Sequence, residues 1–217
     1  MENKLLAFGD SFTHGDELSD CFNEPPYYPS KLTWPSLLAK DLNLEYRSYA
    51  VPGCSNQTIL RRILNNTQVL HNSFVIVNWT WIDRWDFYNT LDNKWETLRP
   101  TKTDSIFYKN YTKYFQSELW DKYETLKAMS TVIDLLESNK IKYLMTCIDN
   151  LVIDSNNHNP PYVNCLMEKV KDKITWFDNL SFLEWSQKNN FVISDNLHPL
   201  EEAHKSAFKY IKTISPK

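Results

Sequence analysis

Glycine is scarce in this sequence. The chain of 217 residues contains three glycines, whereas average usage of roughly 7% would give about fifteen. A chain that uses glycine so sparingly is expected to keep it at tight turns, or where backbone amides approach a ligand. Two of the three, Gly9 and Gly15, flank Ser11, and the third is Gly53 in the stretch YAVPGCSNQ. The scarcity of glycine therefore directs attention to two loops.

Several other features are missing, and each absence excludes a class of protein. No apolar run approaches the length of a membrane span, and the first residues lack the basic and apolar regions of a secretory signal, so we expect a cytoplasmic protein. No dense cluster of Lys and Arg occurs and the formal net charge is -3, so nucleic acid is not an expected partner. The cysteines are scattered without a C-x-x-C pair, which argues against a zinc site or a disulfide framework.

Short apolar runs alternate with amphipathic stretches along the chain. We expect strands at 4–8, 45–51, 73–81 and 141–148, and helices at 34–42, from 56 onward, at 119–136 and at about 199–214. This alternation predicts βαβ units and a mostly parallel sheet with helices on both faces, within a single domain spanning residues 1–217. Residues 84–117 are rich in aromatic and charged side chains without a clean period, and we expect them to form an insertion or lid.

The loop that contains Ser11 is expected at the ligand-binding end of this sheet. Ligands bind beyond the carboxyl ends of parallel strands, which brings the loops 9–17, 52–56 and 78–84 to one rim. Ser11 could be a nucleophile, or Asp10 and Ser11 could simply cap the next helix. A nucleophilic serine needs a base, a group that orients the base, and donors for the oxyanion.

His198 is the histidine with the clearest partner. Asp195 precedes it by three residues, and Pro199 favours an extended conformation at His198, so the imidazole is expected on a loop where Asp195 can fix its tautomer. A loop salt bridge at a helix start is the alternative. His204 is the rival base, but it lies within the amphipathic final helix, where a packing or capping role is expected. The other histidines, which lack an evident partner or a favourable spacing, are His14, His71 and His158.

Four segments, FGDSFTHGDE, Gly53, FVIVNWTWID and DNLHP, resemble in order and spacing the sequence blocks of the SGNH (GDSL-type) hydrolases. The resemblance implies a three-layer α/β/α sandwich with a mostly parallel, flavodoxin-like central sheet. It further implies that Ser11 attacks an ester carbonyl, that His198 is the general base and that Asp195 orients it, with no cofactor. The backbone N–H groups of Ser11 and Gly53 would hold the oxyanion.

The third of these blocks departs from the family pattern G-x-N-D, because Thr80 stands at the Gly position and Ile82 at the Asn position. Asn78 and Thr80 share one side of the strand, so either could supply the missing oxyanion donor, and Arg84 is a candidate with longer reach. Losing one such donor costs about two to three orders of magnitude in turnover.

From the resemblance as a whole we predict an ester hydrolase, with a small acyl group on a carbohydrate as the suggested substrate. The alternative is a weak or inactive SGNH-fold module that binds a glycan or another ligand.

Further side chains near these loops have more than one interpretation. The additional substrate-binding candidates are Asp10, Trp79, Trp81 and Arg84; the tryptophans could stack on sugar rings or hold an acyl chain, or could only pack the insertion. Carboxylates and an imidazole follow Ser11 closely and could in principle bind a metal ion. Their spacing matches no known ligand pattern, so we expect a solvated acidic loop instead. The residues concerned are Asp10, His14, Asp16, Glu17 and Asp20. A phosphate-binding domain using the Gly9 loop is disfavoured, because no glycine-rich phosphate motif is present.

Overall fold

The computed structural model describes residues 2–21, 28–100 and 106–214. Its main sheet is parallel and has the strand order β2-β1-β3-β6. The strands are β1 (Lys4–Phe8), β2 (Glu45–Ser48), β3 (Ser73–Trp79) and β6 (Tyr143–Cys147). They lie within the four stretches predicted from the sequence, and three of them are shorter than predicted. The mostly parallel α/β fold is therefore confirmed.

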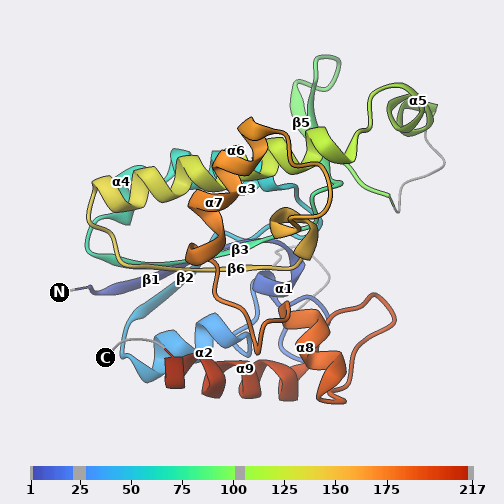
Figure 1. The fold of residues 1–217 in the computed structure, drawn as a ribbon. Coiled ribbons are helices and arrows are strands. Elements are labelled where there is room, and N and C mark those ends of the chain that lie inside the picture. Colours follow the sequence, from blue (N-terminus) through green and yellow to red (C-terminus); the bar gives the residue numbers. More distant parts are fainter. Residues whose placement is uncertain (1, 22–27, 101–105, 215–217) are drawn as a thin grey trace.

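Helices cover both faces of this sheet (Figure 1). One layer contains α3 (Asn56–Asn65), α4 (Thr67–Leu70), α6 (Glu118–Ser138) and α7 (Pro161–Val170); the other contains α2 (Trp34–Asp41), α8 (Phe182–Lys188) and α9 (Glu201–Ile214). Leu6 and Val75 face the first layer, whereas Leu5 and Ile76 face the second. Successive strand side chains point to opposite faces, so a continuous apolar run is buried on both sides. The predicted three-layer sandwich follows from this arrangement.

The helix that follows β2 begins at Asn56, as predicted, whereas the last helix begins later than predicted. The helix that follows β2 is capped by Ser55, whose hydroxyl accepts the N–H of Thr58 at 3.1 Å. The last helix begins at Glu201 rather than near residue 199, because Pro199 pairs with Ile193 in an isolated bridge. Short 3-10 helices lie on either side of α7, η1 (Asn150–Ile153) before it and η2 (Lys171–Lys173) after it.

His204 has a capping role in this fold. It is fully buried in α9, and its Nδ1 accepts the N–H of Trp34, the first residue of α2, at 3.2 Å. Burial lowers the pKa of His204 to about 3, so the ring is neutral and can accept this hydrogen bond. His204 therefore connects two helices of the same layer.

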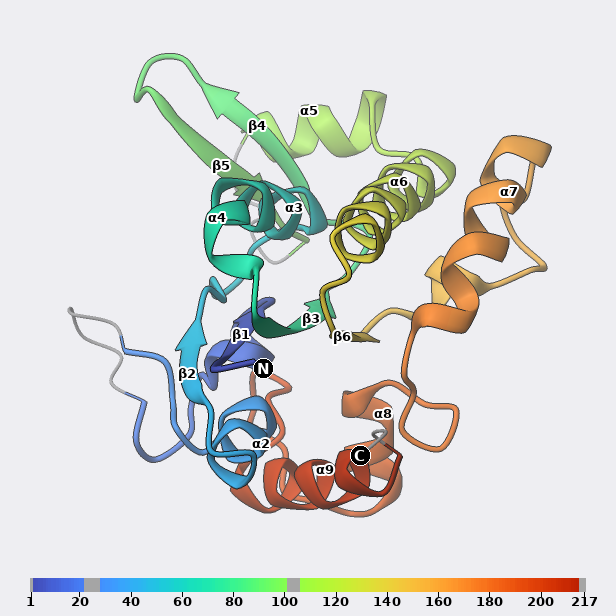
Figure 2. The ribbon, with the colours of Figure 1, turned by 90° about the vertical axis from the view of Figure 1, so that its left-hand side faces the viewer.

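The described parts of the segment 84–117 form a small aromatic unit beside the main sandwich, and residues 101–105 of the predicted insertion lie outside the described residues. The unit consists of an antiparallel hairpin, β4 (Trp85–Asn89) and β5 (Lys94–Leu98), and the helix α5 (Ile106–Tyr114). Figure 2 shows the hairpin projecting from the layer that contains α3 and α6. The ring of Trp85 stacks on Tyr111 with centroids 4.6 Å apart. That this segment acts as a lid stays a prediction.

Within the described ranges, no helix combines the length and apolar character that crossing a membrane requires.

Candidate active site

Ser11 lies at the carboxyl end of β1, at the start of the short helix α1 (Ser11–His14). Asp10 caps this helix, because its carboxylate accepts the N–H of Phe12 at 3.1 Å. The helix ends after one turn at Gly15, whose φ of +85° belongs to the left-handed region that favours glycine. The sharp turn from strand to helix places Ser11 just beyond the carboxyl end of β1. Figure 1 shows α1 below the sheet at this end.

A hydrogen-bonded row of three side chains links this loop to the segment before α9. The Nε2 atom of His198 lies 2.9 Å from the Oγ of Ser11. On the other side of the ring, Nδ1 is hydrogen-bonded to a carboxylate oxygen of Glu17. The edge of the Phe12 ring packs against the imidazole, with centroids 5.5 Å apart and an angle of 89° between the planes. A hydroxyl, an imidazole and a carboxylate in this order can activate a nucleophile.

Glu17 is held in place by several donors besides the imidazole. One of its oxygens accepts the hydroxyl of Ser194 at 2.5 Å, and the other accepts the amide of Asn196 at 2.7 Å. Burial raises the pKa of Glu17, but the hydrogen bonds from Ser194, Asn196 and His198 outweigh burial, and the net pKa lies below the ordinary value. Glu17 is therefore an anion at neutral pH. Its φ of +67° is uncommon for a residue with a side chain and marks a conformation fixed by these contacts.

The prediction that Asp195 orients His198 is wrong, because Glu17 occupies that place. A tight turn precedes the imidazole: Ser194 donates its N–H to the carbonyl of His198, and its own carbonyl accepts the N–H of Leu197. In this turn the side chain that reaches back is Ser194, which contacts both the His198 N–H and Glu17. Asp195 is exposed and, within the described part of the chain, forms no hydrogen bond or ion pair.

Two backbone amides are available near the Ser11 hydroxyl. Gly53 follows Pro52 in the turn that connects β2 to α3, and its φ of +69° is the conformation that a proline-glycine turn requires. The turn is closed by a hydrogen bond of 3.2 Å from the N–H of Cys54 to the carbonyl of Val51. The N–H groups of Ser11 and Gly53 donate to no acceptor among the described residues. Both lie on loops that follow neighbouring strands, as the sequence predicts.

Asn78 and Thr80, predicted as further oxyanion donors, bind Asp10 instead. The hydroxyl of Thr80 donates to the Asp10 carboxylate at 2.7 Å, and the side-chain amide of Asn78 lies 3.5 Å from the same group. All three residues are buried, and Asp10 and Thr80 have no exposed surface. The prediction that Asp10 contacts substrate is therefore also wrong. Asp10 fixes the nucleophile loop to the end of β3.

Arg84 connects the same carboxylate to the Gly53 loop. Its Nη1 lies 3.3 Å from an oxygen of Asp10 and donates to the carbonyl of Cys54 at 3.0 Å. Because Asp10 precedes Ser11 and Cys54 follows Gly53, Arg84 ties together the two loops that carry the free amides. The role of Arg84 seen in the contacts is to position these loops, and its side chain also borders the open site.

The site opens into a cavity of about 530 Å³. Its floor includes Ser11, Gly53 and His198, and its walls come from all three predicted loops and the hairpin segment. The lining residues are Ser11, Asp16, Pro52, Gly53, Trp81, Asp83, Arg84, Arg99, Pro100, Asn196 and His198. Trp81 is thus in a position to contact a bound molecule. Trp79, the other tryptophan predicted to do so, is wrong as a candidate because it is fully buried in the core.

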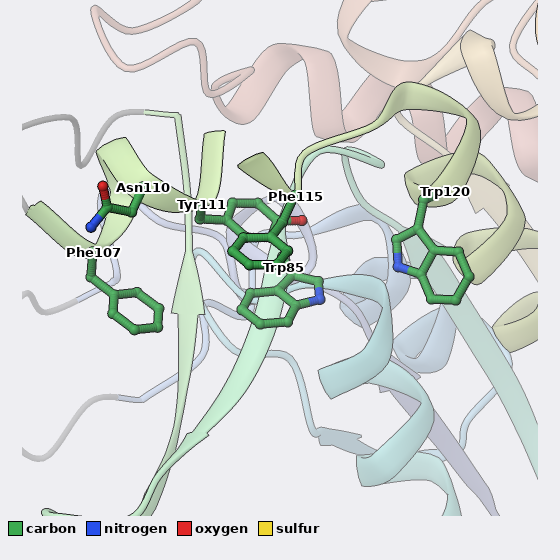
Figure 3. A pocket seen from close by; sticks show the side chains of 6 residues that line it. All are labelled: Trp85, Phe107, Asn110, Tyr111, Phe115 and Trp120. Atoms are coloured by element: carbon green, nitrogen blue, oxygen red, sulfur yellow. The ribbon is translucent and has the colours of Figure 1, made fainter. Parts of the chain in front are cut away.

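A second cavity lies within the aromatic unit and is almost entirely apolar. Its volume is about 590 Å³, and Figure 3 shows its walls formed by rings from β4, α5 and the start of α6. The lining residues are Trp85, Phe107, Asn110, Tyr111, Phe115 and Trp120. Burial is the main cause of a raised pKa at neighbouring Asp121, to about 7, and the charges of Asp83 and Glu118 add to it.

One group of potential metal ligands lies within the described residues. The ligand atoms of His14, Asp16 and Cys21 lie within 4.8 Å of one another. The His14 Nδ1 is hydrogen-bonded to Asp16 at 2.8 Å, and the Cys21 thiol lies 3.7 Å from that nitrogen. The Nδ1 atom of His14 is therefore already engaged by these two side chains. Burial, with the charges of Asp16 and Asp20, raises the pKa of Cys21, which disfavours the thiolate that a metal would bind.

Comparison with solved structures identifies the fold. A protein from Desulfitobacterium hafniense DCB-2, described as a lipolytic protein of the G-D-S-L family, has a TM-score of 0.52 and 15% identity, over 99% of this chain and 100% of that chain. The psychrotrophic esterase EstA from Pseudoalteromonas sp. has a TM-score of 0.54 and 12% identity, with coverages of 98% and 96%. The acetyl xylan esterase AlAXEase has a TM-score of 0.51 and 15% identity, with coverages of 98% and 100%. No family model and no curated protein matches the sequence. The chain has the SGNH hydrolase fold, as its motifs predict.

Sequence reasoning missed two residues of this site, Glu17 and Arg99. Glu17 was part of the acidic loop after Ser11, and the available signal was its place on the rim, six residues beyond the serine. Arg99 follows β5 in the segment without periodicity, and no motif marks it.

Proposed function

We propose that the protein is a serine hydrolase that cleaves carboxylic esters through an acyl-enzyme on Ser11. The observation that carries this proposal is the contact of 2.9 Å between Ser11 Oγ and His198 Nε2, with Glu17 on the opposite ring nitrogen. An ionised Glu17 accepts the Nδ1 proton, which leaves Nε2 unprotonated and able to accept the hydroxyl proton. This is the tautomer that a general base requires.

The reaction follows from these positions. Ser11 Oγ attacks the ester carbonyl while His198 Nε2 takes its proton, and the N–H groups of Ser11 and Gly53 stabilise the oxyanion. The tetrahedral intermediate collapses when the C–O bond to the alcohol breaks, and the imidazolium returns the proton to the leaving oxygen. Water then attacks the acyl group with His198 again as base, which releases the carboxylic acid and restores Ser11.

The suggested substrate is a small acyl group on a carbohydrate or another polar alcohol. The open cavity with Trp81 on one wall offers an aromatic face for a sugar ring. The similarity to a structure described as an acetyl xylan esterase supports the same choice.

Labelling by a fluorophosphonate tests the proposal, because the reagent reacts with activated serines. We expect the purified protein to be labelled, and the variants Ser11→Ala and His198→Ala to lose labelling and at least about a thousandfold in turnover of 4-nitrophenyl acetate. Ser206→Ala, on α9, is the matched control and should retain both. Circular dichroism spectra establish that each variant is folded. Labelling that persists in Ser11→Ala would contradict the assignment of the nucleophile.

The second candidate function is a non-catalytic module that binds a glycan. It is favoured by the third sequence block, in which the side chains expected to complete the oxyanion site are occupied by Asp10. An unlabelled wild-type protein that still binds acetylated oligosaccharides would support this function and exclude the hydrolase.

A further inference from the structure

Arg99 places a guanidinium beside the proposed oxyanion site. It follows β5 and lines the same cavity as Ser11 and His198. Its Nη1 lies directly against Gly53: a methyl group built on that glycine would be 1.9 Å from this nitrogen. A molecule bound to Ser11 and to the Gly53 amide is therefore within reach of Arg99.

The charge of Arg99 has no partner within the part of the chain that the structure describes. No carboxylate forms an ion pair with it, and its Nε is buried without a hydrogen-bond acceptor. Burial, and secondly the charge of Arg84, lowers the pKa of Arg99. Arg99 is partly buried, so its guanidinium has lost part of its hydration without gaining a counter-ion, and an anion that enters the cavity can pair with it.

The other four arginines differ from Arg99 in this respect. Three are in ion pairs, Arg47 with Glu45, Arg61 with Asp86 and Arg84 with Asp10, and Arg62 donates to a backbone carbonyl at 2.7 Å. Arg99 is therefore an exception among the arginines of this chain, and it lies beside the proposed reaction centre.

The acidic residues of the cavity do not remove the charge of Arg99. Asp16 is paired with His14 at 2.8 Å. Asp83 forms no hydrogen bond or ion pair with Arg99 among the described residues. On its other side Arg99 borders a hollow of about 510 Å³, in which Arg61 is paired with Asp86 and Lys94 with Asp92 and Glu96. These neighbouring cations have their own counter-ions, so the guanidinium of Arg99 is the group that an anion entering the cavity would meet.

We propose that Arg99 binds an anionic group of the substrate, so that the enzyme acts on esters that carry a carboxylate or a similar oxyanion close to the scissile bond. This inference rests on the proposed hydrolase function and narrows its substrate class. A planar guanidinium donates two parallel hydrogen bonds to a carboxylate, which fixes both the position and the orientation of the ester. The anion can belong to the acyl part or to the alcohol.

Two pairs of esters distinguish these sources. For the acyl part, 4-nitrophenyl hydrogen succinate is compared with its neutral methyl ester; for the alcohol part, 4-acetoxybenzoate is compared with 4-acetoxybenzamide. The measured quantity is the ratio of kcat/KM for the charged and neutral member of each pair. In the wild type we expect this ratio to exceed one in at least one pair, by about tenfold or more, as charge-assisted hydrogen bonds imply.

The variant Arg99→Gln should reduce that ratio by about tenfold or more, and Arg99→Lys should reduce it less, because the charge remains and the two-pronged geometry is lost. Arg47→Gln, on the exposed edge strand β2, is the matched control and should leave the ratio unchanged. Equal ratios in the wild type and Arg99→Gln for both pairs would overturn the proposal.

Binding separates failure of this inference from failure of the hydrolase function. Calorimetry with Ser11→Ala and 4-acetoxybenzoate measures recognition without turnover. Binding that weakens about tenfold or more when Arg99→Gln is added supports the anion site, even if the wild type hydrolyses neither ester pair. Undetectable binding, or equal binding in both proteins, overturns it.

Thermal stability distinguishes a binding role of Arg99 from a purely structural one. Replacing a structural arginine would lower Tm, whereas replacing an unpaired cation should not. We therefore expect the Tm of Arg99→Gln to be equal to or above that of the wild type.

Discussion

Replacing Glu17 by Gln removes the charge from the row of side chains while keeping its shape. During the reaction His198 becomes an imidazolium, and its attraction to a carboxylate at roughly 4 Å between charge centres is about 4 kcal/mol at the effective dielectric of a partly buried pair. The glutamine cannot supply this attraction, and its amide group can face Nδ1 and favour the wrong tautomer. A loss of about 4 kcal/mol corresponds to a fall in kcat of about a thousandfold.

Steady-state hydrolysis of 4-nitrophenyl acetate and the rate of fluorophosphonate labelling measure this effect. Asp195→Asn is the matched control, since it removes an exposed carboxylate, three residues from His198, that forms no hydrogen bond or ion pair within the described residues. It should retain activity within about twofold, a change near the noise of surface substitutions. If Glu17→Gln keeps more than a tenth of the wild-type kcat, or if Asp195→Asn loses more than tenfold, the assignment of the orienting carboxylate is refuted.

The other predictions concern stability and the oxyanion loop. Because burial lowers the pKa of His204 to about 3 from an ordinary 6.5, its contribution to stability is complete above pH 6.5 and is lost as the pH falls from there toward 3, by up to about 1.4 kcal/mol per pH unit. Urea unfolding at pH 7 and pH 5 should therefore show a smaller difference for His204→Gln than for the wild type; an equal difference would contradict the neutral ring. Gly53→Ala should lower Tm and reduce kcat/KM by about ten- to a hundredfold, since the methyl group meets Arg99 and the backbone has a φ of +69°. Wild-type kinetics in Gly53→Ala would argue against the role of this amide.

The parallel sheet was predictable because its information is local. Each strand is a short apolar run that is buried on both faces, and each helix shows its own period, so both follow from neighbouring residues. The hairpin at residues 85–98 was not predictable in the same way. Its aromatic side chains lie on both faces, some stacked on α5 and others exposed, so burial does not alternate along β4 and β5.

The site was only partly predictable because several of its contacts join distant residues. The motif resemblance singled out Ser11 and His198, which the structure brings together. The choice of carboxylate depended on how the turn before His198 is closed, and a spacing of three residues could not distinguish Asp195 from an acid that is 181 residues away. That Arg99 has no partner among the described residues is likewise a property of the folded arrangement alone.

Since Ser11 and Glu17 lie on one loop, the three side chains come from two pieces of chain rather than three. The serine and the carboxylate are six residues apart on this loop, and the C-terminal segment reaches them through Ser194, Asn196 and His198. A shift of the single turn at Ser194–His198 would break both hydrogen bonds of the ring together, which makes assembly of the row an all-or-none event. Chemical competence would then depend on the docking of one short stretch and not on gradual adjustments along the rim.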